Sequence, residues 1–142
     1  MIDKVGRKRL AILERFLRKE VPPRRFDMLT WISGAKFCGI VAPPEALHKE
    51  CGSTACALGW ATTIPAFKRA GLRFDGGSPY FLPPDTKYGS YSFNAGAAFF
   101  HIRIEDANYL FEPSCYPTLN TTPTEVASRI RGLLKGGKRH GT

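Results

Sequence analysis

Long apolar runs are missing from this sequence. A helix that spans a bilayer needs about 20 consecutive apolar residues, and the uncharged stretch between Glu50 and Lys68 is too short to supply them. A secretory signal needs an apolar core of about 7–15 residues behind its N-terminal charges, and Glu14, Arg15 and Arg18 interrupt the only candidate. We therefore expect a cytoplasmic protein without a membrane partner.

Sequence patterns typical of common enzyme sites are missing as well. The chain has 3 histidines in unrelated settings, no glycine-rich phosphate-binding fingerprint, no paired-carboxylate site and no HExxH pattern. Each of these patterns has a known chemical use, in nucleotide binding, acid–base catalysis or zinc-dependent hydrolysis. Their absence favours a non-enzymatic role.

Size and composition predict a single domain. The chain has 142 residues, of which 43% are hydrophobic and 23% charged, and these are ordinary values for a globular protein. A chain of this length buries about two-thirds of its unfolded surface on folding. We predict one helical domain over residues 1–136 and a basic flexible tail over residues 137–142.

Positive charge is present in excess and lies mainly at the two ends of the chain. The net charge is +9, with +6 in residues 1–25, +5 in residues 129–142 and −2 in the centre. Concentrated charge of this kind raises encounter rates with acidic partners such as nucleic acid or an acidic protein surface. The alternative is that these Lys and Arg side chains only solvate the outer faces of two terminal helices.

The basic residues of the two ends would form one partner-binding surface if the terminal helices pack side by side. The candidate binding residues are Arg7, Lys8, Arg9, Arg15, Arg18, Lys19, Arg24 and Arg25 from the first end, and Arg129, Arg131, Lys135, Lys138 and Arg139 from the second. Such a surface would bind phosphates without reading sequence, and its binding would weaken with salt. Tyr80, Tyr88 and Tyr91 could stack on bases or on a partner protein, or could simply fold over the core.

Helical spacing of apolar residues predicts most of the secondary structure. Residues 3–20, 93–101 and 104–111 each place apolar side chains on one face at this spacing. The last helix has the clearest start, because Thr122-Pro123-Thr124-Glu125 is a capping box with proline at the first helical position. A turn signal at Asp75-Gly76-Gly77 predicts one hairpin.

A central helix is expected at about residues 54–63, where residues that are small or apolar on every side follow Ser53 and Thr54. A helix that is apolar all round is normally buried by its neighbours. The predicted fold class is therefore mainly α: a compact orthogonal helical bundle around this buried helix, with one small β-hairpin at about 72–82.

Four residues near the central helix could bind a metal or carry thiol chemistry. Cys38, His48, Cys51 and Cys56 offer four zinc ligands, although their C-x9-H-x2-C-x4-C spacing is not that of a common zinc finger. Cys51 or Cys56 could instead be a nucleophile near a helix N-terminus with His48 as its base, or the two could form a redox pair. Free buried cysteines also act as small hydrophobic side chains. We expect no cofactor, with zinc as the alternative.

The motif Phe26-Asp27-Met28-x2-Trp31, followed by Cys51-Gly52-Ser53-x-Ala55-Cys56-x2-Gly59-Trp60-Ala61, resembles that of a group of small uncharacterised bacterial and phage proteins. Their pattern is close to FDMxxW … CG[ST]xACxxG[WH]A, and the similarity covers about residues 24–112. The resemblance implies a compact helical unit around the cysteine motif. It implies no activity and no catalytic residue.

The predicted function is a non-enzymatic accessory or regulatory module. Its basic terminal helices would bind an acidic partner, which could be nucleic acid or an acidic protein surface. One alternative is a small thiol-dependent or redox protein that uses Cys51 and Cys56. A second alternative, which follows from the resemblance alone, is a phage-encoded inhibitor of a host protein.

Overall fold

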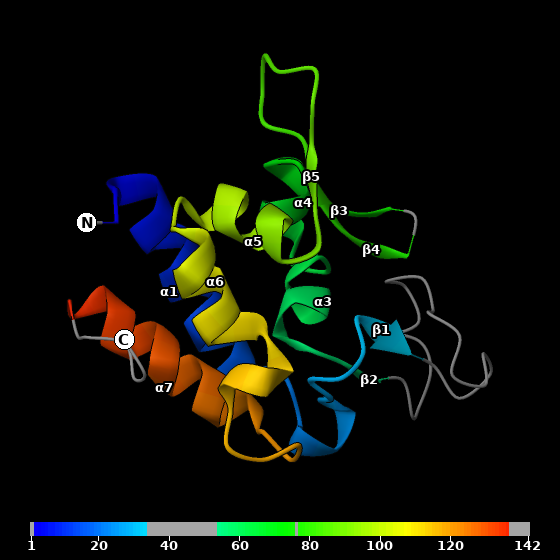
Figure 1. Cartoon of the computed structure of the whole chain (residues 1–142), viewed down its shortest axis with the longest axis vertical. Helices are drawn as coiled ribbons and strands as arrows, with labels where there is room; N and C mark the ends of the chain where they lie inside the picture. The colour runs from blue at the N-terminus through cyan, green and yellow to red at the C-terminus, as the bar shows by residue number, and fades with distance from the viewer. Residues whose placement is uncertain (1, 34–53, 76, 137–142) are drawn as a thin grey trace.

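The structure is a computed structural model that describes residues 2–33, 54–75 and 77–136. These residues form, in chain order, α1 (Lys4–Lys19), η1 (Pro23–Arg25), β1 (Ile32–Ser33), β2 (Thr54–Ala55), α3 (Ala57–Ala61), α4 (Pro65–Arg69), β3 (Leu72–Asp75), β4 (Ser78–Phe81), β5 (Ser90–Tyr91), α5 (Ser92–Phe100), α6 (Ile104–Phe111), η3 (Pro113–Cys115) and α7 (Pro123–Leu134). Figure 1 shows their arrangement.

The first helix begins and ends as its sequence predicts. Asp3 is the N-cap of α1, and its Oδ1 atom accepts a hydrogen bond of 2.8 Å from the Gly6 amide. The helix buries Leu10, Leu13 and Leu17, which lie on one face at intervals of three and four residues. Burial of this stripe gives α1 a single inner face and leaves the opposite face in solvent.

The last helix packs along the first. The predicted capping box is confirmed, since the Thr122 side chain accepts from the Glu125 amide and the Glu125 carboxylate accepts from the Thr122 amide. Val126, Ala127 and Ile130 form its buried face. Among the described elements, α1 and α7 make the most extensive contact (Figure 1), so the first and last helices lie together.

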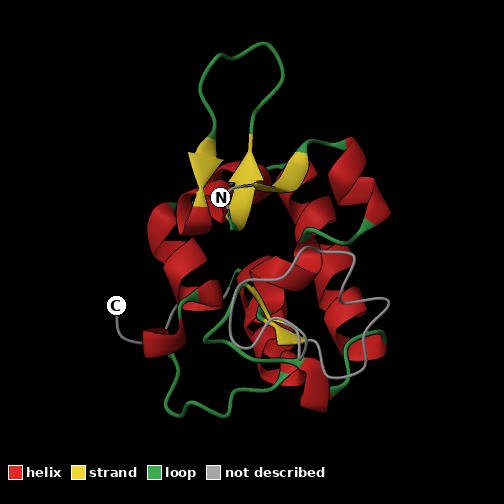
Figure 2. Ribbon diagram, turned by 90° about the vertical axis from the view of Figure 1, so that its right-hand side faces the viewer, coloured by secondary structure: helices red, strands yellow, loops and turns green. Residues whose placement is uncertain are grey.

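The prediction of a mainly helical bundle with one hairpin is wrong. Strands β3 and β4 form the expected hairpin, but β5 extends it to a three-stranded antiparallel sheet, and β1 pairs with β2 in a second, two-stranded sheet. The protein therefore has a mixed α/β fold. In Figure 2 the three-stranded sheet lies toward the top, with helices beside and below it. Strand β5 was not predicted, because its two residues are too few to show an alternating pattern.

The expected central helix is also shorter than its sequence suggests. Thr54 and Ala55 belong to β2 rather than to a helix, and α3 begins only after Cys56. The Cys56 amide donates to the Thr30 carbonyl (2.9 Å), while the Ala55 carbonyl accepts from the Asp27 amide (3.0 Å). These hydrogen bonds to residues far away in the sequence hold Ala55 and Cys56 in an extended conformation. All five residues of α3 are buried, as the apolar composition predicts.

An aromatic cluster joins the sheet to the helices. Phe99 of α5 packs edge-on against Phe67 of α4 and Phe81 of β4, with ring centroids 4.9 and 5.2 Å apart. Its neighbour Phe100 contacts Phe111 of α6 with centroids 5.8 Å apart. Edge-to-face pairs of this kind stabilise a core beyond simple area burial. Helix α5 thereby links α4, the sheet and α6 into one core.

Candidate anion-binding face on helices α1 and α7

Helix α1 carries a row of cations opposite its buried stripe. Lys4, Lys8, Arg15 and Lys19 are separated by 4, 7 and 4 positions, all four are exposed, and none has an ion-pair partner among the residues that the structure describes. At about 1.5 Å per residue the row is about 22 Å long. We call these four residues the outer stripe.

A second set of basic residues connects α1 to α7. The Arg7 guanidinium donates to the Leu134 carbonyl at the end of α7. The Glu14 carboxylate on α1 pairs with Arg18 of its own helix and with Arg131 of α7, in both cases at 2.9 Å. Arg7, Arg18, Arg131 and the exposed Lys135 therefore extend the outer stripe, and the eight residues together form the α1/α7 face.

Glu14, the carboxylate that lies within this face, is already neutralised. The Glu14 side chain is only 13% exposed, and its two arginine partners leave it little capacity for another cation. At the start of α1, the Asp3 carboxylate accepts from the Gly6 amide and lies 2.7 Å from His101 Nδ1. These two hydrogen bonds, the first being the larger influence, lower the pKa of Asp3. At the C-terminal end of α1, the C-cap residue Glu20 is an exposed acid.

Two predicted binding residues, Arg9 and Arg129, have structural contacts instead. The Arg9 guanidinium lies 4.1 Å from the Phe99 ring centroid and donates to the Phe99 carbonyl at 2.7 Å, and its burial lowers its pKa. Arg129 lies 3.7 Å from the Tyr116 ring centroid and donates to the Tyr109 carbonyl at 2.8 Å. Such contacts bury the planar cation and fix neighbouring elements.

The remaining predicted cations lie away from the α1/α7 face or outside the described residues. Arg24 and Arg25 are in η1, where Arg24 is exposed and Arg25 lies 5.5 Å from the Trp60 ring centroid. Lys138 and Arg139 lie outside the described residues. Lys4 was not among the predicted binding residues, although its spacing of four from Lys8 was a usable signal. The contact between Glu14 and Arg131 had no such signal, because it depends on the packing of α7.

In the described part of the cysteine motif, Cys56 is buried in the core and caps helix α3. Its side chain is 2% exposed, and its Sγ atom accepts a hydrogen bond of 3.4 Å from the Gly59 amide at the N-terminus of α3. Burial raises the pKa of the Cys56 thiol to about 11. A nucleophilic cysteine needs an accessible thiolate, so this environment suits a structural thiol. The proposed nucleophile Cys51 and base His48 lie outside the described residues.

Within the described ranges, no group of three or more His, Cys, Asp or Glu side chains could hold a metal ion. Three of the four residues of the suggested zinc site, Cys38, His48 and Cys51, fall outside those ranges. The alternative of a zinc site therefore stays a prediction.

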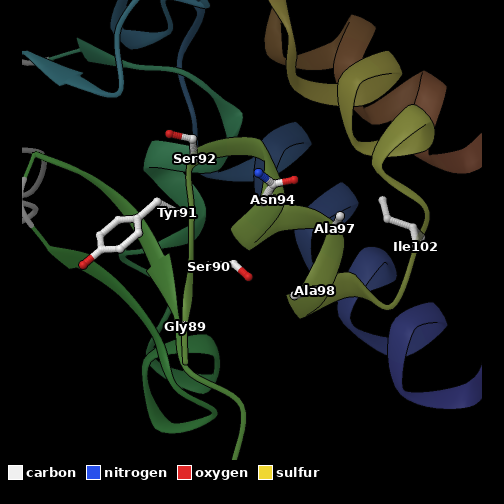
Figure 3. A pocket seen from close by; sticks show the side chains of 8 residues that line it. All are labelled: Gly89, Ser90, Tyr91, Ser92, Asn94, Ala97, Ala98 and Ile102. Carbon is white, nitrogen blue, oxygen red and sulfur yellow. The ribbon is translucent and has the colours of Figure 1, made fainter. Parts of the chain in front are cut away.

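A hollow of about 650 Å³ lies between β5 and α5 (Figure 3). It is lined by Gly89, Ser90, Tyr91, Ser92, Asn94, Ala97, Ala98 and Ile102. Hydroxyl, amide and small apolar groups make up this lining, and Tyr91 is its only titratable residue. The Tyr91 ring points away from α5 in Figure 3 and lies 4.6 Å from the Tyr80 ring, between centroids. The lining contains no His, Lys, Asp or Glu that could activate the hydroxyl groups of Ser90 and Ser92.

The third predicted tyrosine lies apart from the α1/α7 face. Tyr88 is 86% exposed on the loop between β4 and β5, which projects from the body of the protein in Figures 1 and 2. The predicted grouping of three tyrosines for base stacking is therefore reduced to one pair of tilted rings in contact, Tyr80 and Tyr91, with Tyr88 apart from them.

No helix in the described part of the chain is both long and apolar enough to cross a membrane. No family model, curated protein or solved structure matches this chain. The resemblance at the cysteine motif thus stays a prediction, and the strongest functional feature of the structure is the α1/α7 face.

Proposed function

We propose that this protein is a non-enzymatic accessory or regulatory module of the cytoplasm that binds an acidic macromolecule through the α1/α7 face. The observation that carries the proposal is the packing of α1 along α7, which places basic residues from both ends of the chain on one surface. Separate basic ends would give two weaker fields, whereas one continuous face adds their potentials.

The scaffold under this face is rigid, which favours binding. The inner side of α1 is buried through Leu10, Leu13 and Leu17, and its flank is held by the Glu14–Arg131 ion pair. Because α1 is already folded and packed, binding a partner adds no cost of ordering its backbone. The cations of the outer stripe have no acidic partner among the described residues, so no internal ion pair has to break.

The experiment compares two variants that remove the same charge from different places. One is K4Q/K8Q/R15Q/K19Q on the outer stripe, and the control is K68Q/R69Q/R73Q/K87Q, whose residues are also exposed but lie on α4, β3 and the loop after β4. Both lower the net charge from +9 by four units. Elution from an anionic resin and titration with soluble polyglutamate and heparin measure the binding.

We expect the outer-stripe variant to elute at clearly lower salt than the control and to bind both polymers at least about tenfold more weakly than the control does. Circular dichroism should show that both variants stay folded, since the substituted side chains are exposed. Equal loss in the two variants would mean that only net charge matters, and the proposal would be wrong.

A further inference from the structure

We infer that the acidic partner is double-stranded DNA, held through its phosphate backbone by α1 lying across a groove. This inference rests on the proposed function, since it assigns a partner to the same α1/α7 face. It follows from the spacing of the cations, from the kinds of side chain that lie between them and from the position of α7.

The outer stripe is divided into two pairs of charges. Lys4 and Lys8 are one helical turn apart, as are Arg15 and Lys19. The centres of the two pairs lie about 16 Å apart along the helix. The major groove of B-form DNA is about 12 Å wide, so a helix lying across it would bring one pair to each of the flanking phosphate backbones.

The residues between the two pairs suit a helix that crosses the groove without reading the bases. Ala11 and Ile12 are half-buried on the flanks of α1 and have no hydrogen-bonding side chains. Sequence recognition in the major groove depends on side chains that pair with base edges, such as Asn, Gln and Arg. The outer stripe is mainly lysine, which contacts phosphate as a point charge. Binding should therefore tolerate any base sequence.

The composition of the face favours a nucleic acid over an acidic protein. Stable protein interfaces have a core with aromatic or apolar anchors surrounded by a polar rim. Val5 is the only large apolar residue of α1 and α7 that is exposed in the described structure. Interfaces with DNA are more polar and much more positively charged, which matches a face of eight cations around one neutralised carboxylate.

The same composition favours a duplex over a single strand. Proteins that bind single strands combine a basic groove with aromatic side chains on which bases stack. On α1, Phe16 is half-buried and packs against Trp60, with centroids 6.0 Å apart, so it is not available to a base. A single strand also lacks the second backbone that the second pair of charges would contact.

Helix α7 adds a contact beside the groove. The exposed Arg131 and Lys135 lie next to α1, since Arg131 reaches Glu14 and the end of α7 reaches Arg7. In this arrangement they would contact phosphates further along one strand. The number of phosphates bound would then exceed the four contacts of the outer stripe and make the affinity depend steeply on salt.

The test measures fluorescence anisotropy of the full chain with labelled probes of about 20 base pairs or nucleotides, a length several times the width of one groove. The probes are a DNA duplex of mixed sequence, a second duplex of unrelated sequence, an RNA duplex and a DNA single strand. Polyglutamate and vesicles that contain anionic phospholipid serve as competitors. Each titration is repeated between about 50 and 200 mM salt.

We expect both DNA duplexes to bind within about threefold of each other and at least about tenfold more tightly than the single strand, because only a duplex offers both backbones. K4Q/K8Q and R15Q/K19Q should each reduce the magnitude of the slope of log K against log salt by about 1.8, and the fourfold variant by about 3.6. The fourfold control variant, whose charges lie away from α1, should keep the slope within about one of the parent's.

The outcomes separate this inference from the proposed function. Binding of polyglutamate or vesicles through the outer stripe, without tight binding of DNA duplex, would overturn the DNA assignment and leave the proposed function standing. Equal or tighter binding of single strand or RNA duplex would overturn the groove-spanning arrangement. If no acidic probe binds through the outer stripe, the inference and the proposed function both fail.

Discussion

The α1/α7 face and the cysteine segment around α3 differ in how much function the sequence suggests and how much the structure supports. Cys56 belongs to a distinctive motif, yet its thiol is 2% exposed and caps a short helix. The terminal lysines and arginines look ordinary, yet the packing of α7 on α1 gathers them on one surface. Reactivity depends on access and environment, whereas charge recognition depends on which residues become neighbours. The accessibility of the thiol and the grouping of the cations are both decided by tertiary packing.

The two regions also differ in how tightly they are packed. In the cysteine segment, Gly59 lies against the carbonyl of Trp31, while Gly132 on the outer side of α7 faces open space. We expect the cysteine segment to tolerate no added side-chain atom at Gly59, and the outer side of α7 to tolerate a larger side chain at Gly132. The following predictions test this contrast, beginning with the largest expected effect.

Gly59→Ala should destabilise the protein by about 3 kcal/mol, because overpacking a fixed core forces the backbone to move. The new Cβ atom would clash with the Trp31 carbonyl oxygen, which is backbone and cannot rotate away. Urea unfolding measures the change. The matched variant Gly132→Ala should instead stabilise α7 by about 0.5–1 kcal/mol, since alanine is the better helix former. A similar small effect at both sites would contradict the contrast.

The stability of the parent protein should fall between about pH 9 and pH 11 more than that of Cys56→Ala. Burial raises the pKa of Cys56 from 9.0 to about 11, so the stabilisation it confers is complete below the unfolded value and is lost as the pH rises through the folded value. The difference between the two proteins should reach about 2–3 kcal/mol. Urea unfolding across this pH range measures it.

Peptide mapping after alkylation gives an independent check on the same thiol. Cys56 should be modified slowly in the folded protein, and the exposed Cys115 should be modified much faster. Rapid modification of Cys56 at neutral pH, or identical pH dependence of the parent and Cys56→Ala, would show that this cysteine is accessible. The cysteine segment would then be as accessible as the α1/α7 face, and the contrast between them would be wrong.

Glu14→Gln should destabilise the protein by about 1 kcal/mol, because it weakens the ion pairs with Arg18 and Arg131 that join α1 to α7. Glu20→Gln removes the same charge from an exposed acid with no side-chain partner among the described residues, and it should change stability by less than about 0.5 kcal/mol. Thermal unfolding at low salt compares them. Equal effects would mean that the ion pairs do not hold the face together.

Asp3→Asn should have the smallest effect, a slight loss of stability at neutral pH that disappears in acid. The amide of Gly6 and the ring of His101 lower the pKa of Asp3 below its ordinary value of 3.8. Its stabilisation is therefore complete above about pH 3.8 and is lost as the pH falls through the lowered pKa. The parent should lose thermal stability over this range more steeply than Asp3→Asn. Glu105→Gln, an exposed acid on α6, should behave like the parent.

Elements with strong local signals were predicted well. The helices that became α1, α5 and α6 were found within about two residues of their ends, and the start of α7 was found from its capping box. Apolar spacing and a capping box act over a few neighbouring residues. Strand β5 and the pairing of β1 with β2 were missed. Each has only two residues, and its hydrogen-bond partners lie elsewhere in the chain.

The candidate binding surface was predicted in part. The exposed Lys8 and Arg15 were identified, and the packing of the terminal helices was stated as the condition for a shared surface. Arg9 and Arg129 were assigned to the same surface, although both lie over aromatic rings. Charge alone does not distinguish an exposed arginine from one that covers a ring, because the same side chain suits both environments.

The sequence by itself determined the positions of the main helices, the excess of positive charge at both ends and the burial of the apolar segment around α3. These properties follow from composition and from short-range periodicity. Tertiary structure decided that Thr54 and Ala55 are a strand, that Cys56 is an inaccessible cap and that α7 lies along α1. The physical reason is that these outcomes depend on backbone hydrogen bonds and side-chain contacts between residues far apart in the chain, which no local pattern specifies.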